Sequence, residues 1–171
     1  MNKFALKYAL LFLLLVPAQA IIFNHLILFD VAVPIVFIYL IVMLPVTIGT
    51  NLSTFLGFLA GLAVDIFCDT PGVNTLSATI LAFARKPIFH LYISMDDDLA
   101  GRSPSSRTMG HAPFMKFLIT MTTLYCAMVF TVEAFQFFNF RLLLLRIIAS
   151  SLYTFILLYA IDCLGLRSRD T

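Results

Sequence analysis

Residues 57–72 are the most informative stretch of the chain, and they read GFLAGLAVDIFCDTPG. Gly57 and Gly61 stand four residues apart in an apolar run, and Asp65 follows one helical turn later, so all three share one helix face. Two small residues at this spacing let a second helix approach closely in a membrane, although glycine pairs also occur there by chance. A carboxylate within an apolar span should face protein and not lipid. The stretch therefore predicts a membrane helix packed closely on a neighbour.

The end of this stretch predicts a tight turn into another helix. Asp69 and Thr70 are candidate N-cap residues, because their side chains can accept hydrogen bonds from the first free N–H groups of a helix. Pro71 suits the first turn of that helix, where no N–H is needed. We therefore expect a helical hairpin around Asp69–Gly72.

The composition of the whole chain indicates a membrane protein. Of its 171 residues, 61% are hydrophobic and 12% are charged, against roughly half and a quarter in ordinary soluble domains. A soluble domain of this size could not hide so much apolar surface, whereas lipid accepts it. The three cysteines lack the spacing of a metal or redox site, and we expect them to be unreactive thiols.

Outward from residues 57–72, the apolar runs predict an all-α bundle of about six transmembrane helices in a single domain, residues 1–171. The runs are Phe4–Phe23, Val31–Leu44, Leu52–Phe67, Val73–Ala84, Pro113–Val132 and Phe140–Leu164. The middle three are shorter than the ~20 residues of a straight crossing. Four crossings are the alternative, if the short runs form a re-entrant hairpin.

Two details qualify the first two runs. Ala18-Gln19-Ala20 has the pattern of a signal-peptide cleavage site, but the apolar run continues past it, so we expect the first helix to be retained. Pro34 predicts that the second helix is bent or starts late.

The basic residues predict that both termini are cytoplasmic. With six crossings, nine of the eleven Lys and Arg residues fall on the inner side, all except Arg141 and Arg146 in the last run. This is the distribution that the positive-inside rule requires. Residues 94–112 then form a polar, proline-containing loop on the cytoplasmic side, which we expect to be mobile.

The sequence carries no pattern typical of catalysis or of cofactor binding. It has no glycine-rich phosphate loop, no nucleophile elbow and no His-Glu-x-x-His helix. Its three histidines fall in different loops or on opposite membrane faces, which argues against a shared metal ion. We read the acidic run Asp96–Asp98 as a solvated surface. The sequence thus predicts a protein that is not an enzyme, with no catalytic, cofactor or metal site.

Arg146 is a second charge inside an apolar run. Snorkelling to the outer interface is one interpretation of it, and a partner within the bundle is the other. In the six-crossing topology, Asp65 and Arg146 fall at similar depth in the outer half of the bilayer, where an unpaired ion costs several kcal/mol. We therefore predict that they pair and fix the third helix against the sixth. Glu133, at the outer end of the fifth helix, is the rival partner of Arg146.

The chain resembles the family of the rod shape-determining protein MreD, in the form found in the Bacteroidetes. The most specific match is Gly61–Phe67 followed by Asp69–Gly72, and weaker matches extend over nearly the whole chain. They are Gln19, Asn24-His25, Leu28-Phe29, Leu44-Pro45, Leu81–Arg85 and Glu133–Arg146. Asp30–Pro34 departs from the pattern, where a glycine and a threonine are expected before the proline. Pattern and resemblance together nominate these residues for helix packing or partner contact: Gly57, Gly61, Asp65, Arg146, Gln19, Asn24 and Glu133.

The resemblance implies a scaffold subunit of the bacterial cell-wall elongation machinery, the elongasome, in the inner membrane. Such a protein pairs with MreC, a single-span protein. The pair connects MreB filaments to the glycosyltransferase RodA and a penicillin-binding transpeptidase, and so controls cell shape and peptidoglycan synthesis. Membrane lipids are further expected partners, and nucleic acid is not.

Two other functions stay open at this point. The family is similar to the substrate-binding membrane subunits of energy-coupling-factor transporters, so a small-molecule or lipid-binding transporter subunit is the main alternative. A membrane enzyme acting on lipid is a third hypothesis, which the missing catalytic groups disfavour.

Overall fold

The computed structural model describes residues 3–23, 32–93, 103–134 and 140–167. Within them the predicted all-α class is confirmed. The helices are α1 (Lys3–Ile21), α2 (Tyr39–Val42), α3 (Thr50–Cys68), α4 (Val73–Tyr92), α5 (Ser106–Met109), α6 (His111–Glu133) and α7 (Phe140–Arg167).

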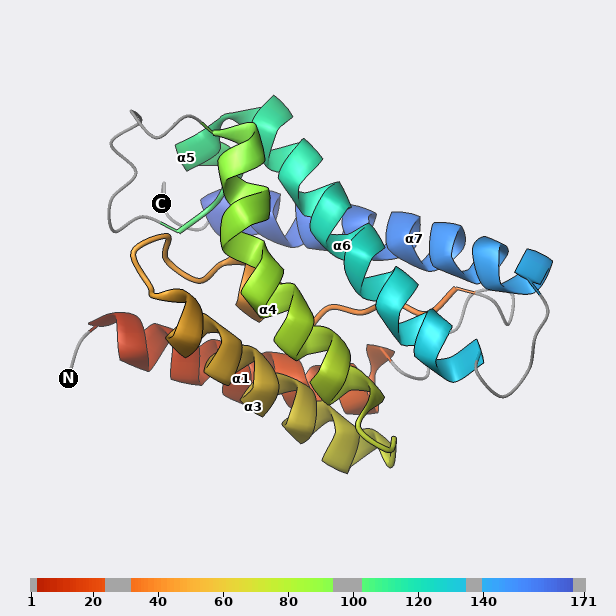
Figure 1. The fold of residues 1–171 in the computed structure, drawn as a ribbon. Coiled ribbons are helices and arrows are strands. Elements are labelled where there is room, and N and C mark those ends of the chain that lie inside the picture. Colours follow the sequence, from red (N-terminus) through yellow and green to blue (C-terminus); the bar gives the residue numbers. More distant parts are fainter. Residues whose placement is uncertain (1–2, 24–31, 94–102, 135–139, 168–171) are drawn as a thin grey trace.

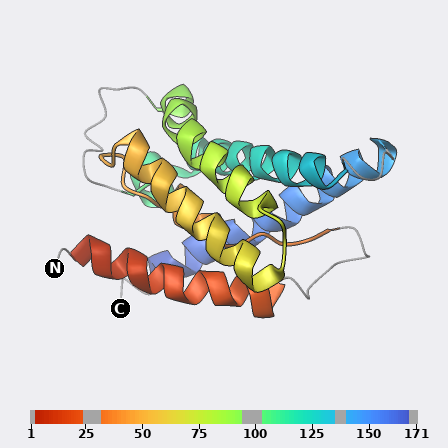
Figure 2. The same ribbon diagram turned by 60° about the horizontal axis from the view of Figure 1, so that its bottom comes forward.

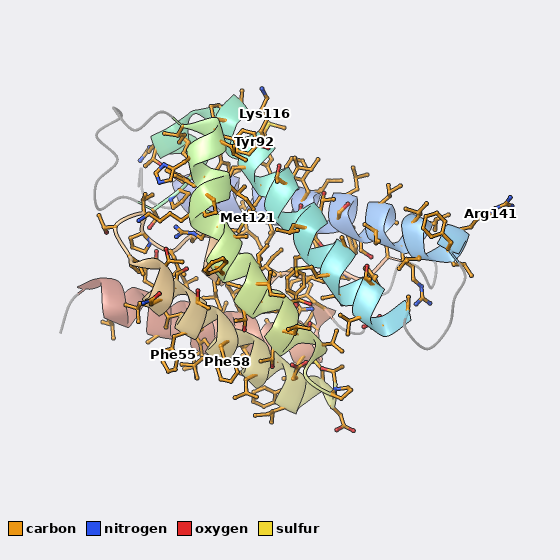
Figure 3. All side chains as sticks on the ribbon, in the orientation of Figure 1. Phe55, Phe58, Tyr92, Lys116, Met121 and Arg141 are labelled. Carbon is orange, nitrogen blue, oxygen red and sulfur yellow. The ribbon has the colours of Figure 1, made fainter. Side chains whose placement is uncertain are left out.

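Three of the described helices have the length and composition needed to cross a membrane. They are α3, α6 and the Phe140–Leu164 part of α7, while α1 carries a shorter apolar stretch, Tyr8–Ile21. The outward faces of these helices are covered by large apolar side chains; Phe55 and Phe58, for example, point away from the bundle on α3 (Figure 3). Such continuous apolar surface suits lipid and not water. The chain is a membrane protein.

The five long helices are neighbours in the order α1, α3, α4, α6 and α7 (Figure 1). The turned view shows that α1 and α3 lie side by side and run in the same direction from the N-terminal end of the molecule (Figure 2). The hairpin partners α3 and α4 run in opposite directions, as do α6 and α7. This arrangement leaves the interior to be filled by side chains and by the segment that links α1 to α3.

The close packing predicted from the two glycines of α3 is confirmed. A Cβ atom built on Gly57 would lie 2.6 Å from the Ala82 Cβ, and one built on Gly61 would lie 2.6 Å from the carbonyl oxygen of Asn74. Both distances are too short for real atoms, so only glycine allows the α4 backbone to come this near. The predicted helical hairpin is also confirmed, because α3 and α4 are consecutive helices that pack against each other across a turn at residues 69–72.

The predicted N-cap residues of α4 are wrong. Asp69 ends α3 as its C-cap, in the left-handed conformation with φ 53°, and the N-cap position of α4 is Gly72, with φ 78°. Pro71 therefore precedes the helix instead of opening it. The side chain that caps α4 comes from Asp65 inside α3, as described below.

The second apolar run does not form the predicted long helix. Residues 33–36 are not helical, and only Tyr39–Val42 makes a single turn, α2. The late start expected from Pro34 is confirmed, since proline disfavours the helical conformation in the residue before it. We call residues 32–44 the central segment, because both ribbon views place it between the surrounding helices (Figures 1 and 2). Val36, Phe37, Ile38 and Val42 in it are 0% exposed.

Part of the predicted loop, residues 94–112, is helical. α4 extends to Tyr92, residues 94–102 lie outside the described residues, and Ser105 and Thr108 then form a capping box for α5. Ser106 is buried, and its hydroxyl donates to Asp162 Oδ2 on α7 at 2.6 Å. Residues 103–109 are therefore fixed to the end of α7 by a buried carboxylate, which the sequence did not reveal.

Candidate functional site

The central segment has no helical hydrogen bonds over residues 33–36, so its main-chain groups need other partners. An unpaired N–H or C=O at membrane depth costs several kcal/mol, and irregular backbone is tolerated there only when protein surrounds it. Side chains from α1 and α7 supply these partners from two sides. They define the most unusual site of the described structure.

Gln19 is the partner on α1. Its side-chain Oε1 accepts from the N–H of Val36 at 2.6 Å and from that of Phe37 at 3.3 Å, and its Nε2 donates to the carbonyl oxygen of Pro34 at 2.9 Å. Gln19 is 3% exposed. One amide side chain thus serves three main-chain groups, which requires both a donor and an acceptor in one residue.

Ser150 and Thr154 are the partners on α7. The N–H of Val33 donates to Ser150 Oγ at 3.0 Å, and the N–H of Ile35 donates to Thr154 Oγ1 at 3.0 Å. The two hydroxyls are one helical turn apart on the same face of α7, so they can bind two N–H groups that lie two residues apart in the central segment. Pro34 has no N–H, so every main-chain N–H from residue 33 to residue 37 has a side-chain acceptor.

The far end of the central segment is held by two longer side chains. The guanidinium of Arg85 on α4 donates to the carbonyl oxygen of Leu44, and the hydroxyl of Tyr8 on α1 donates to that of Met43. Arg85 is 3% exposed, and its Nε has no hydrogen-bond partner among the described residues. These bonds cover the last carbonyl groups of the segment before Pro45, where the chain leaves the bundle interior.

A second polar cluster, centred on Asp65, joins the two helices of the hairpin. Its Oδ2 accepts from the N–H of Thr75 at 2.7 Å and from the Thr75 hydroxyl at 2.5 Å. Its Oδ1 accepts from the N–H of Asn74 at 3.1 Å, from the Asn74 amide at 3.0 Å and from the Thr70 hydroxyl. The second and third N–H groups of α4 are the ones that an N-cap side chain normally binds. A buried carboxylate at this helix N-terminus is also favoured by the helix dipole.

The Asp65 cluster reaches a third helix through Tyr125 on α6. Its hydroxyl donates to Asn74 Oδ1 at 2.7 Å, while its ring meets Phe37 of the central segment edge to face, with 5.6 Å between ring centres. Tyr125 is therefore the side chain that touches both polar clusters. It connects the hairpin to the interior of the bundle.

The predicted ion pair between Asp65 and Arg146 is wrong. All five hydrogen bonds to the Asp65 carboxylate come from the α3–α4 turn and the start of α4. Arg146 is exposed on α7, and it interacts electrostatically with Glu133, the rival partner. The depth of a residue along a span follows from the sequence, but the direction in which its side chain points does not.

The nominated residues therefore separate into groups. Gly57, Gly61 and Asp65 come together in the hairpin, whereas Gln19 belongs to the central segment. Glu133 and Arg146 are exposed, near the end of α6 and the start of α7. Asn24 lies outside the described residues.

Sequence reasoning missed Ser150, Thr154, Arg85 and Tyr125. The first two carry a usable pattern, namely two small hydroxyl residues one turn apart in an otherwise apolar helix. Isolated Ser and Thr residues are common in membrane helices, so the pattern alone does not name a partner.

Comparisons of the chain with protein-family models, with curated proteins and with solved structures all end without a match. The function must therefore be argued from the chemistry of the site. In the described part of the chain, no three His, Cys, Asp or Glu side chains gather as a metal site would require.

A groove of about 650 Å³ lies beside the central segment, between α1 and α3. Its only side-chain hydroxyls are those of Tyr8 and Thr47, and the remaining lining is apolar. That lining consists of Ala9 and Phe12 on α1, Leu40, Ile41, Leu44, Pro45 and Ile48 in or after the central segment, and Leu52, Leu56, Leu59 and Ala60 on α3.

Proposed function

We propose that this chain is a non-enzymatic scaffold subunit of the cell-wall elongation machinery in the bacterial inner membrane. The resemblance to the MreD family motivates the proposal. In this account the chain pairs with a single-span MreC-like protein, and through it with MreB, RodA and a penicillin-binding transpeptidase. Both termini face the cytoplasm, as the basic residues require.

The observation that carries the proposal is how the buried polar groups are used. Asp65 and Gln19 are both buried, and each forms several hydrogen bonds that hold the chain itself. A catalytic or transport site would need such groups free to meet a substrate. Polar groups committed to structure are what a scaffold needs.

The exposed surface offers apolar helix faces to a partner. On α7, Leu145, Ile148, Leu152 and Ile156 are all exposed and follow at three- or four-residue steps, so they form one stripe along the helix. We call these four residues the α7 stripe. A single-span helix could pack along it over several turns, and we place the MreC-like partner there.

The main alternative, a small-molecule transporter subunit, receives less support. Such subunits place convergent polar groups in a cavity near the middle of the membrane. The groove beside the central segment offers only two hydroxyl side chains in an apolar lining. An apolar groove suits a scaffold or a lipid-binding protein better than a carrier of polar solutes.

Site-specific photo-crosslinking in the native host tests the proposed partner. A photoreactive residue at Ile148, which is 64% exposed in the α7 stripe, should give an adduct with a single-span membrane protein. The matched control is Phe55 on α3, which is 55% exposed on a different side of the bundle and should give no such adduct. Adducts with lipid alone from every α7 position would overturn the partner assignment.

Depletion of the protein separates the two functions. If the chain is an elongasome scaffold, depleted rod-shaped cells should become round and then lyse on rich medium. If it is a transporter subunit, cells should keep their shape and grow again when one nutrient is supplied in excess. Reporter fusions that place the C-terminus outside the cytoplasm would contradict the proposed topology.

A further inference from the structure

We propose that the groove between α1 and α3 holds the acyl chain of an anionic phospholipid from the surrounding membrane. Its lining comes from α1, from α3, and from the end of the central segment with the residues that follow it. Along α3 it extends from Leu52 to Ala60, which is about 12 Å at about 1.5 Å per residue. We call this groove the slot.

The polarity of the slot changes along its length as an amphiphile would require. Tyr8 and Thr47 lie at the end where α1 and α3 begin, and the Tyr8 hydroxyl also shares a 2.9 Å hydrogen bond with Ser103. Phe12, one turn further along α1, and Leu56 and Leu59 on α3 line the deeper part. A molecule with a polar head and an apolar tail can satisfy both ends at once.

The slot opens towards lipid. Leu52 and Leu59 line it and are still 54% and 37% exposed, so its α3 wall continues into the exposed apolar surface of that helix. On α1, Leu13 follows the lining residue Phe12 on the neighbouring outer face and is 73% exposed. A membrane lipid can therefore enter sideways without passing through water.

The charge near the polar end favours an anionic headgroup. Arg85 donates to the Leu44 carbonyl and acts electrostatically on Tyr8, and its Nε has no hydrogen-bond partner within residues 3–23, 32–93, 103–134 and 140–167. Basic residues close to a membrane surface attract anionic lipids, each by about fivefold in affinity.

The size of the slot argues against a partner helix as the occupant. An α-helix with its side chains is about 10–12 Å across, so 650 Å³ would hold only roughly one to one and a half turns of it. Such a short contact would bind a membrane helix only weakly, whereas an acyl chain can lie along the slot over its whole length.

Tryptophan fluorescence gives the first test, because the chain contains no Trp. Phe12→Trp places the only tryptophan at the slot, and Leu13→Trp places it on the neighbouring outer face as the control. Each variant is reconstituted in bilayers of phosphatidylglycerol and phosphatidylcholine, with bromine on the acyl chains of one lipid at a time. For Phe12→Trp, we expect binding derived from quenching to favour phosphatidylglycerol by about fivefold or more. For Leu13→Trp, both lipids should quench equally.

Equal quenching of Phe12→Trp by both lipids would overturn the preference for an anionic headgroup, and no quenching would overturn the acyl-chain site.

Retention of lipid through purification gives the second test. Leu56→Trp fills the slot, whereas Leu62→Trp adds the same side chain to the same helix outside it. We expect the wild-type protein and Leu62→Trp to retain phosphatidylglycerol in native mass spectra, and Leu56→Trp to lose most of it.

Equal retention by Leu56→Trp and Leu62→Trp would contradict the proposal. If Leu56→Trp does not fold, Ala9→Phe fills the slot from the α1 wall and carries the same expectation. A protein adduct in place of a lipid adduct from a photoreactive residue at Leu59 would also overturn it. The lipid site and the scaffold function fail separately, because the first is read in purified protein and the second in cell shape.

Discussion

The α3–α4 hairpin and the central segment solve one problem in two ways. Each contains main-chain N–H groups that lack the hydrogen bonds of a helix interior, and in each a buried side chain accepts from them instead. In the hairpin, Asp65 binds residues five to ten positions further along the chain. In the central segment, Gln19 is 15 to 18 positions away from its partners, and Ser150 and Thr154 are 117 and 119 positions away from theirs.

This difference in sequence separation has a physical consequence. The hairpin can form from local interactions as soon as α3 and α4 meet. The central segment can be satisfied only when α1 and α7 are both in place, because each supplies part of its hydrogen bonds. We therefore expect the hairpin to be the autonomous part of the bundle and the central segment to depend on the rest.

The largest loss of stability is expected for Asp65→Ala. The change removes the carboxylate that caps α4 and leaves its partners buried without an acceptor, which should lower the free energy of unfolding by about 3–4 kcal/mol. Asp69→Asn is the control, since Asp69 is an exposed carboxylate four residues away and asparagine tolerates its left-handed conformation. Chemical unfolding in detergent, followed by circular dichroism, measures both. Similar free energies of unfolding for the two variants would contradict the role of Asp65 in stabilising the hairpin.

Gln19→Ala tests the other side of the comparison. It leaves the N–H of Val36 and the carbonyl of Pro34 unpaired in the interior, and we expect a loss of about 2–3 kcal/mol. The exposed amide Asn51 provides the control, and Asn51→Ala should change the free energy of unfolding by less than about 0.5 kcal/mol. A Gln19→Ala protein as stable as the control would mean that the central segment does not depend on α1.

Gly61→Ala sharpens the account of the hairpin. The added methyl group would lie 2.6 Å from the α4 backbone at Asn74 and Thr75, so the helices must move apart, at a cost of about 1–3 kcal/mol. At Gly49 a Cβ would meet nothing within 4 Å, which makes Gly49→Ala the control. Thermal unfolding of the two variants, measured in parallel, should show a lower midpoint for Gly61→Ala only.

The smallest effect is expected for Arg146→Ala. Arg146 is exposed, and an exposed charge that interacts with another contributes roughly 0–1 kcal/mol. The free energy of unfolding should therefore stay within about 0.5 kcal/mol of the wild-type value. The exchanged pair Asp65→Arg with Arg146→Asp should be as unstable as Asp65→Ala, and recovery by the exchange would restore the ion pair that the structure contradicts.

The sequence predicted what depends on short range. The glycine pair of α3, the hairpin turn and the all-α class follow from residues close together in the chain, and all are confirmed. The partner of Asp65 was missed because depth along a span gives no information on side-chain direction. The N–H groups at the start of α4 are close to Asp65 in the sequence, and they occupy its carboxylate in place of a distant arginine.

The central segment could not be predicted for a different reason. Val31–Leu44 is as apolar as a membrane helix, and hydropathy does not distinguish a helix facing lipid from an irregular segment surrounded by protein. Pro34 and Pro45 mark its ends, and Gln19 is an amide in an apolar helix, but none of these names its partners. Those partners include Ser150 and Thr154, at the other end of the chain.

The central claim is that residues 33–36 lie inside the bundle without helical structure. The most direct measurement is the Cα and Cβ chemical shifts of residues 31–44 by NMR spectroscopy of the protein in lipid bilayers. We expect non-helical shifts for residues 33–36 and helical shifts for Tyr39–Val42, as the structure has them. Helical shifts that continue without a break through Pro34 to Leu44 would contradict the account and restore an ordinary second membrane helix.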